Sequence, residues 1–243
     1  MTTPPVRADT PRARVVRYEI IYRNTRMGRI VCVANQKGGV GKTTTASNVA
    51  AGLAKSGRRT LLVDLDPQCN ATTGLGGSPA ETHPLVSETA LSETIMSTAV
   101  TNLSLLPGSR SVRDVERLAE QARNGSMVLS NHLSCGLNAW DYCLIDCPPS
   151  LGELTRTALA GSTEVLMPIQ CEYFALEGLT QMIEVIRDVM AEQPGRLSFS
   201  GIVLTMHDAD LELTTEVEQE VRDFFGEIVF DTVIPRDVAV SEA

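Results

Sequence analysis

The chain lacks any apolar run long enough to cross a membrane. No window contains the roughly 18 or more uncharged apolar residues that a spanning helix requires. The first residues, Met1 to Arg7, also lack the apolar core and cleavage site of a secretory signal. We therefore expect a cytoplasmic protein with no membrane partner.

The cysteines lack the spacing of a metal site. Six are scattered through expected strands and loops without a short repeated interval, which is typical of reduced, buried thiols in a cytosolic protein. Internal repeats and low-complexity tracts are also missing from the chain. With 243 residues and 43% apolar composition, the sequence fits one large α/β domain.

Positive charge is scarce outside the N-terminal segment. Residues 1–29 contain seven arginines against two acidic residues, whereas the rest has fourteen basic and twenty-eight acidic residues, a balance of −14. An acidic body is not the electrostatic footprint of a general nucleic-acid binder, although the basic segment could act as a DNA-binding arm. We interpret residues 1–28 as a disordered basic extension, with Met27 an alternative start, and residues 29–243 as the folded domain.

The most informative stretch is a glycine-rich turn between an apolar run at 30–34 and a helical pattern at 45–56. Glycines let successive backbone N–H groups point into one concavity, and the helix start adds partial positive charge there. This arrangement predicts a site for nucleotide phosphates. The expected contacts are Lys37, Gly38, Gly39, Val40, Gly41, Lys42, Thr43 and Thr44.

Acidic residues end two further apolar runs. Asp64 and Asp66 follow one run and Asp146 ends another. The carboxyl ends of parallel strands meet at one edge of a sheet, so these acids should lie near the phosphate loop. Lys42 would contact the β- and γ-phosphates, while Thr43 and Asp146 would hold Mg²⁺, the latter through water.

Apolar runs and helical patterns alternate along the chain. The alternation predicts a mostly parallel sheet with helices on both faces, as in P-loop NTPases. Further strands are expected near 103–106, 164–169, 201–206 and 228–234, and helices near 89–97, 110–137, 176–190 and 214–225. Residues 70–88 and the segment after Pro235 are expected to be loops, and we interpret the missing closing helix as a truncation.

The string from Lys37 to Thr44 resembles the deviant Walker A motif of the ParA/MinD ATPases. From Gly28 onward the chain is similar to the ParA/Soj branch, whose other markers are Asp64–Thr72, Asp146–Ser150, Pro168–Gly178 and Ile234–Ala243. The resemblance implies ATP and Mg²⁺ as cofactors and a homodimer closed by ATP, with Lys37 contacting the nucleotide of the partner.

The same resemblance implies roles for individual residues. Lys37, Lys42 and Asp66 would be catalytic, with Asp66 positioning the attacking water and joining Thr43 and Asp146 near the metal. Pro235 and Asp237 would contact adenine. The dimer would bind DNA nonspecifically and associate with the nucleoid, and a ParB-like activator would stimulate the weak hydrolysis that drives chromosome or plasmid partition.

Two departures from the family pattern put DNA binding in doubt. Asp210 and Ala239 stand where relatives often have arginine. Both changes remove positive charge, and the first adds negative charge, which opposes phosphate contacts. An acidic, solvated loop in an ordinary member of the family is an equally good interpretation.

Three other classes of protein remain open. A MinD-like or other cargo-positioning ATPase shares the loop, but no C-terminal amphipathic helix for membrane binding is present. An electron carrier similar to the nitrogenase iron protein would use cysteines such as Cys69 and Cys147, although its Cys-Gly-Gly type segment is missing. A nucleotide-gated scaffold would bind ATP without hydrolysis, which the presence of Lys37 and Asp66 disfavours.

Overall fold

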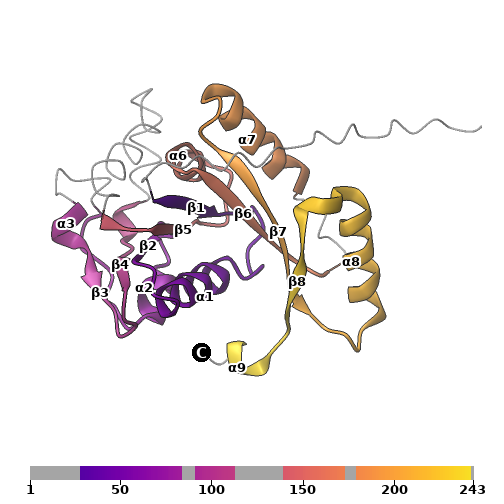
Figure 1. Ribbon diagram of the computed structural model, residues 1–243, viewed down its shortest axis with the longest axis horizontal. Helices are drawn as coiled ribbons and strands as arrows, with labels where there is room; N and C mark the ends of the chain where they lie inside the picture. The colour runs from indigo at the N-terminus through magenta and orange to yellow at the C-terminus, as the bar shows by residue number, and fades with distance from the viewer. Residues whose placement is uncertain (1–27, 84–90, 113–138, 173–178, 242–243) are drawn as a thin grey trace, which may run out of the picture.

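The computed structural model describes residues 28–83, 91–112, 139–172 and 179–241. Within these ranges eight strands form one sheet in the order β3-β4-β2-β5-β1-β6-β7-β8 (Figure 1). Every pairing is parallel except that of β3 with β4, so the predicted mostly parallel sheet is confirmed. The strands are β1 (Arg29–Val33), β2 (Thr60–Asp64), β3 (Met96–Ser97), β4 (Leu103–Leu106), β5 (Tyr142–Asp146), β6 (Glu164–Gln170), β7 (Ser198–His207) and β8 (Val229–Pro235).

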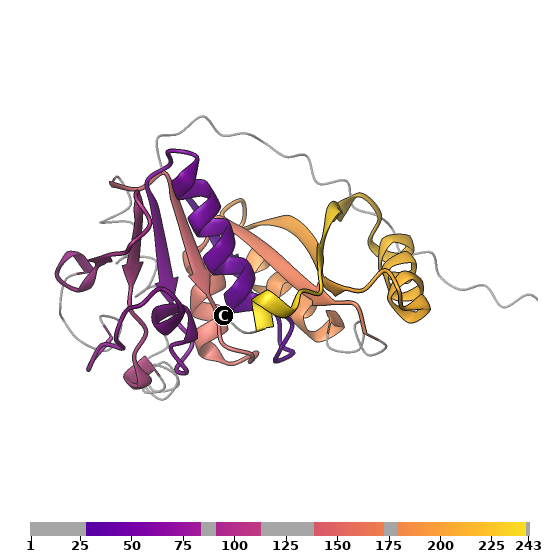
Figure 2. The same cartoon turned by 90° about the horizontal axis from the view of Figure 1, so that it is seen from below.

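Helices cover both faces of this sheet. In Figures 1 and 2, α1 lies on one face, while α6 and α7 lie on the other. The helices are α1 (Lys42–Lys55), α2 (Asn70–Gly74), α3 (Leu91–Thr94), α6 (Glu153–Gly161), α7 (Leu179–Glu192), α8 (Glu212–Phe225) and α9 (Val238–Ser241), with 3-10 turns η1 (Arg110–Val112) and η3 (Gly226–Ile228).

Two apolar cores hold the layers together. On one face, Ala46, Ala50 and Ala54 of α1 pack against strand residues such as Leu62 and Leu144. Small side chains allow α1 to approach the sheet closely. The other core contains residues from α6, α7 and α8, and it is the larger cluster. Strands β2 and β5 are central and buried along nearly their whole length, which explains their continuous apolar sequences.

The strand register places the acidic ends of the central strands side by side. Asp64 of β2 pairs with Asp146 of β5, and Val33 of β1 pairs with Asp146 on the other side. The turn that begins after β1 therefore starts at the same edge as both carboxylates. This is the edge where open α/β sheets bind their ligands.

Several short elements differ from the sequence-based expectations. Residues 70–74 form α2 instead of loop, and the expected helix at 89–97 is reduced to α3 followed by β3. Helix α6 was not predicted. A single turn, α9, also forms after β8, where only loop was expected. The helices predicted within 110–137 and the start of the one predicted at 176–190 lie largely outside the described residues.

Candidate functional site

The glycine-rich loop joins the end of β1 to the first turn of α1. Gly39 and Gly41 have φ angles of 76° and 82°, a left-handed conformation that favours glycine. Helix α1 begins at Lys42, earlier than the sequence pattern indicated, so Lys42, Thr43 and Thr44 form its first turn. The orphan N–H groups of this turn and the helix dipole favour an anion at this position.

Neighbouring strands hold the loop from both ends. The Asn35 side chain donates a hydrogen bond to the Pro168 carbonyl (2.7 Å) and accepts one from the Lys37 N–H (3.0 Å). The Thr205 hydroxyl, at the end of β7, donates to the Val40 carbonyl (2.9 Å) and is buried. These contacts fix the loop against β6 and β7 without any bound nucleotide.

Both lysines of the loop have partners within the same chain. The Lys42 ammonium is buried and donates a hydrogen bond to the Lys37 carbonyl (2.8 Å). The Lys37 ammonium lies 3.3 Å from a carboxylate oxygen of Glu172, just after β6, in a pair whose side chains are 36% and 46% exposed. Because this ion pair is open to solvent, it contributes little to stability and leaves Lys37 able to move.

Asp146 has the environment expected of a carboxylate that holds a cation. It is completely buried, and neither of its oxygens accepts a well-formed hydrogen bond among the described residues, although the Thr43 hydroxyl lies near enough to act on it. Burial raises the pKa of Asp146 to about 7, with the Thr43 hydroxyl and the Lys42 ammonium acting in the opposite direction. An unpartnered buried carboxylate is costly unless a cation compensates it, so Asp146 and Thr43 fit a Mg²⁺ site.

Lys42 belongs to the same electrostatic group. Burial lowers the pKa of Lys42, whereas the nearby carboxylates of Asp146 and Asp66 favour its charged form. Within the described residues no group of three or more His, Cys, Asp or Glu side chains could hold a metal ion by itself. Mg²⁺ often binds through one or two protein groups together with substrate phosphates, and the pair of Asp146 and Thr43 fits this mode of binding.

Asp66 lies in the turn after β2 and is nearly buried. Its backbone N–H donates to Asp64 (3.1 Å), and its carboxylate accepts a hydrogen bond from the Gln68 N–H (2.9 Å). Asp66 also acts electrostatically on both Lys42 and Asp146, so the three charged side chains lie near one another at the same edge of the sheet.

The residues predicted to contact adenine lie at the end of β8 and in the turn that follows it: Pro235 ends β8, and Asp237 immediately precedes α9. Pro235 and Asp237 are both exposed, and the Asp237 carboxylate accepts a hydrogen bond from the Ala239 N–H (2.8 Å) at the start of α9. The preceding Arg236 N–H donates to the His207 carbonyl (2.8 Å), which ties the turn to the end of β7.

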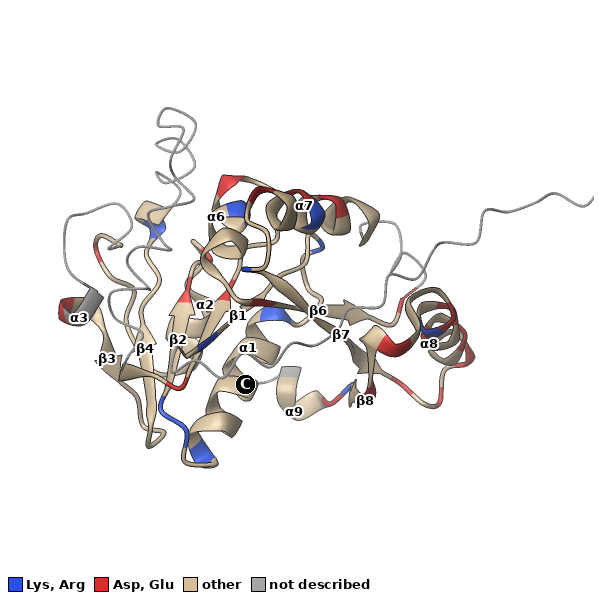
Figure 3. Cartoon of the chain, turned by 45° about the horizontal axis from the view of Figure 1, so that its top comes forward, with Lys and Arg blue, Asp and Glu red and all other residues tan. Residues whose placement is uncertain are grey.

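The connection between β7 and α8 is acidic. The Asp210 N–H donates to the Asp208 carboxylate (3.1 Å) in the turn that precedes α8. Glu212, Glu216 and Glu220 then follow at four-residue intervals and are exposed. Figure 3 shows acidic residues along α8. This surface is unfavourable for a polyanion, because its charge has the same sign as a phosphate backbone.

Comparison with known proteins decides the family. A family model described as an AAA domain (AAA_31) matches residues 28–199. The sporulation initiation inhibitor protein Soj of Bacillus subtilis strain 168 is 43% identical over 222 residues, which cover 89% of this chain and 88% of that protein. The chromosome-partitioning ATPase Soj of Treponema pallidum strain Nichols is 44% identical over 221 residues, with 89% and 87% coverage.

The chain belongs to the Soj/ParA family of chromosome-partitioning ATPases. A solved structure named cobyrinic acid a,c-diamide synthase, from Mycobacterium smegmatis with bound ADP and magnesium, is also similar. It is 34% identical, has a TM-score of 0.82, and matches over 88% of this chain and 89% of its own. The predicted family and P-loop fold are thus confirmed, and related solved structures with bound ADP or an ATP analogue together with magnesium agree with the predicted ATP and Mg²⁺.

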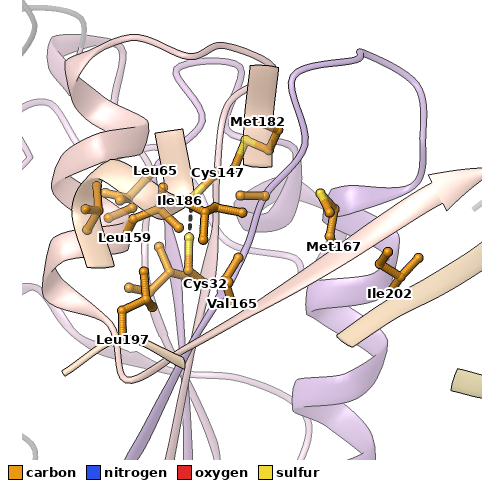
Figure 4. Close-up of a cluster of buried hydrophobic side chains, with 14 of the residues drawn as sticks. Cys32, Leu65, Cys147, Leu159, Val165, Met167, Met182, Ile186, Leu197 and Ile202 are labelled. Carbon is orange, nitrogen blue, oxygen red and sulfur yellow. Dashed lines mark hydrogen bonds between the residues drawn. The ribbon is translucent and has the colours of Figure 1, made fainter. Parts of the chain in front are cut away.

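Two cysteines of this Soj/ParA chain, Cys32 and Cys147, meet in the apolar core. Cys147 follows Asp146, and its sulfur lies 3.3 Å from that of Cys32 on β1, both buried among apolar side chains (Figure 4). The contact with Cys32, together with burial, raises the pKa of Cys147 well above its ordinary value. A thiol held protonated in this way is a poor cluster ligand, which disfavours the electron-carrier interpretation.

Sequence reasoning missed several residues that support this site. The motifs contain Glu172 and Thr72, but no pattern indicates that Glu172 meets Lys37 or that Thr72 meets Asp64. Thr205 gives no sequence signal at all, since it stands within an apolar strand. Within the described ranges, no helix of the Soj/ParA chain is long and apolar enough to span a membrane.

Proposed function

We propose that this chain is an ATP hydrolase that acts as a switch in the partition of chromosomes or plasmids. The observation that carries the proposal is Asp146, a buried carboxylate that accepts no well-formed hydrogen bond among the described residues, beside a lysine and a threonine at a helix start. Partition is proposed because the Soj and ParA relatives are 42–44% identical, more than the 34% of the Mycobacterium smegmatis diamide synthase.

In the proposed complex, the triphosphate of ATP lies against the first turn of α1. Backbone N–H groups from Gly38 to Thr44 would surround the phosphates, and Lys42 would leave the Lys37 carbonyl to contact the β- and γ-phosphates. Thr43 and Asp146 would hold Mg²⁺, with Asp66 nearby. The ion would offset the negative charge on the phosphate oxygens during transfer.

Asp66 is proposed to orient the attacking water. Support comes from its position at the same edge as Lys42 and Asp146 and from the backbone hydrogen bond that holds it to Asp64. The test is phosphate release by the wild type and by Asp66→Ala. We expect hydrolysis by the wild type and loss of turnover in the variant, with ATP binding retained. Hydrolysis at the wild-type rate by Asp66→Ala would exclude this role.

Lys37 is proposed to reach the nucleotide of a second subunit. Its ion pair with Glu172 is solvent-exposed and easily exchanged, so the lysine can transfer to a phosphate at low cost. Analytical ultracentrifugation with ATP should show a dimer for the wild type and Asp66→Ala, but a monomer for Lys37→Ala. A stable Lys37→Ala dimer would contradict the proposal.

The proposed adenine contacts are Pro235 and Asp237, whose turn is exposed and tied to the end of β7. Replacing Asp237 by alanine should weaken the binding of ATP more than the binding of inorganic triphosphate, because only ATP carries the base. Equal losses for both ligands would remove Asp237 from the base site.

Activation by a ParB-like protein and nonspecific DNA binding complete the proposed switch. The acidic turn at Asp208 and Asp210, followed by exposed glutamates of α8, supports a second candidate: a cargo-positioning ATPase with weak or no DNA binding. Gel-shift titration with ATP over a salt series separates the two. ATP-dependent, salt-sensitive retention of DNA supports the partition switch, and its absence at low salt supports the second candidate.

A further inference from the structure

Asp64 is a buried carboxylate for which the proposed reaction has no direct use. It ends β2, is completely buried, and accepts hydrogen bonds from three donors. One oxygen accepts from the backbone N–H (2.8 Å) and the hydroxyl (2.7 Å) of Thr72 in α2. The other accepts from the backbone N–H of Asp66 (3.1 Å).

Thr72 connects this carboxylate to a third segment. Its hydroxyl oxygen accepts a hydrogen bond from the Gly108 N–H (2.7 Å), just after β4. The hydroxyl can therefore donate to Asp64 and accept from Gly108 at the same time. A continuous chain of hydrogen bonds runs from Gly108 through Thr72 and Asp64 to the backbone of Asp66.

The segments joined by these hydrogen bonds approach one another so closely that only glycine fits at position 108. A Cβ atom on Gly108 would lie 2.9 Å from the Asp64 carboxylate and 3.1 Å from the Cys69 sulfur. Cys69 itself has a φ angle of 58°, which is unusual for a residue with a side chain. The turn from Asp66 to Thr72 thus holds a strained conformation that its surroundings must maintain.

We propose that the hydrogen-bond chain formed by Asp64, Thr72 and Gly108 positions Asp66 for ATP hydrolysis. This inference rests on the proposed function, in which Asp66 orients the attacking water. Asp64 is a positioning residue and not a catalytic one, because it is wholly buried and its oxygens are already occupied by three donors. Charge-assisted hydrogen bonds of this kind are stronger than neutral ones and restrict movement of the turn.

The Thr72 hydroxyl is the group in this hydrogen-bond chain that a substitution can remove with the least change in side-chain shape. Thr72→Val deletes the bonds to Asp64 and Gly108 but retains the backbone bond to Asp64. Thr72→Ser restores the hydroxyl. Thr73→Val is the matched control, because among the described residues the Thr73 hydroxyl bonds only to the carbonyls of Asn70 in α2 and of Cys69 just before it, and its side chain is exposed.

The experiment measures single-turnover hydrolysis of ATP, the dissociation constant of ATP with Mg²⁺, and the unfolding midpoint for each variant. In Thr72→Val we expect hydrolysis to slow by about tenfold or more, because small misplacements of catalytic groups are costly, with the dissociation constant unchanged. Thr72→Ser should recover to within about threefold of the wild type, and Thr73→Val should hydrolyse ATP normally.

Two results would overturn the inference. One is normal hydrolysis by Thr72→Val. The other is evidence for a purely structural role. Such evidence would be a loss of hydrolysis that correlates with the fall in unfolding midpoint across all variants, or a loss that Thr72→Ser does not rescue. Should Thr72→Val fail to fold, Thr72→Ala takes its place as the variant without the hydroxyl and is compared with Thr72→Ser.

The same measurements distinguish an error in this inference from an error in the proposed function. Should the wild type not hydrolyse ATP, or should Asp66→Ala hydrolyse it normally, the proposed function itself is wrong. When the wild type is active, Asp66→Ala is inactive and Thr72→Val is normal, only the positioning role is excluded.

Discussion

Replacing Asp146 by asparagine is expected to stabilise the ligand-free protein at neutral and alkaline pH. Burial raises the pKa of Asp146 from 3.8 to about 7, so between these values the folded chain keeps a proton that the unfolded chain has lost. Stability therefore falls as the pH rises through this interval, by about 1.4 kcal/mol per pH unit. Above pH 7 the accumulated loss is about 4 kcal/mol.

Asparagine has no charge to desolvate, so this loss should be missing from the variant. From pH 5 to pH 8, the difference in unfolding free energy should shift in favour of Asp146→Asn by about 3 kcal/mol. Any cost of an unpaired amide is the same at both pH values and does not affect the shift. Urea denaturation of the wild type and of Asp146→Asn at pH 5 and pH 8 measures this shift.

Asp141→Asn is the matched control for this prediction. Asp141 lies just before the other end of the same strand, is partly exposed, and has its pKa lowered by the hydrogen bond from Arg59. Both its folded and unfolded pKa values lie below pH 5, so its replacement should give the same stability difference at pH 5 and pH 8.

A second measurement connects this stability to function. Mg²⁺ with ATP at about 100 times the dissociation constant should raise the unfolding free energy of the wild type by about 3 kcal/mol. Asp146→Asn should gain much less, because it has lost the carboxylate that the metal offsets. A pH-independent difference between variant and wild type, or equal stabilisation by Mg²⁺ and ATP, would refute the reasoning about Asp146.

Substitutions at two further positions, Thr205 and Glu172, test the loop and its partners. Thr205→Val leaves the Val40 carbonyl without its buried hydrogen bond, so it should cost about 1–3 kcal/mol in urea denaturation and weaken ATP binding, while Thr205→Ser should preserve both. Restored stability without restored ATP binding in Thr205→Ser would contradict a role in shaping the loop. Glu172→Gln should change the unfolding free energy by no more than about 1 kcal/mol, because the pair with Lys37 is exposed. A loss above about 2 kcal/mol would show that Glu172 is a structural anchor.

The long elements and the phosphate loop could be predicted from the sequence because each carries its own local pattern. Buried parallel strands are continuously apolar, as Thr60–Asp64 and Tyr142–Asp146 are. The loop needs glycine at specific backbone angles, and Gly39 and Gly41 adopt them. Alternation of strands and helices then limits the fold to a covered parallel sheet.

Short elements could not be predicted, because tertiary contacts and not local propensity hold them. Residues 70–74 include two threonines and a glycine, poor helix formers, yet α2 forms where Thr72 bonds to Asp64. Helix α6 has nine residues, seven of them buried, and these include Thr155 and Thr157, whose polar side chains interrupt the apolar pattern that would have indicated a core-facing helix. Two residues are too few for β3 to show any alternation.

The sequence by itself determined that a phosphate loop, two acidic strand ends and a Soj/ParA pattern occur in one α/β chain. It placed Lys42, Asp66 and Asp146 in one site through the rule that parallel strands end at a common edge. Only the tertiary structure decided which groups are left without partners. Asp64 and Asp146 are paired neighbours with the same side chain and the same burial. The fold supplies three hydrogen bonds to Asp64 and no well-formed one among the described residues to Asp146, because hydrogen bonding depends on segments that are distant in sequence.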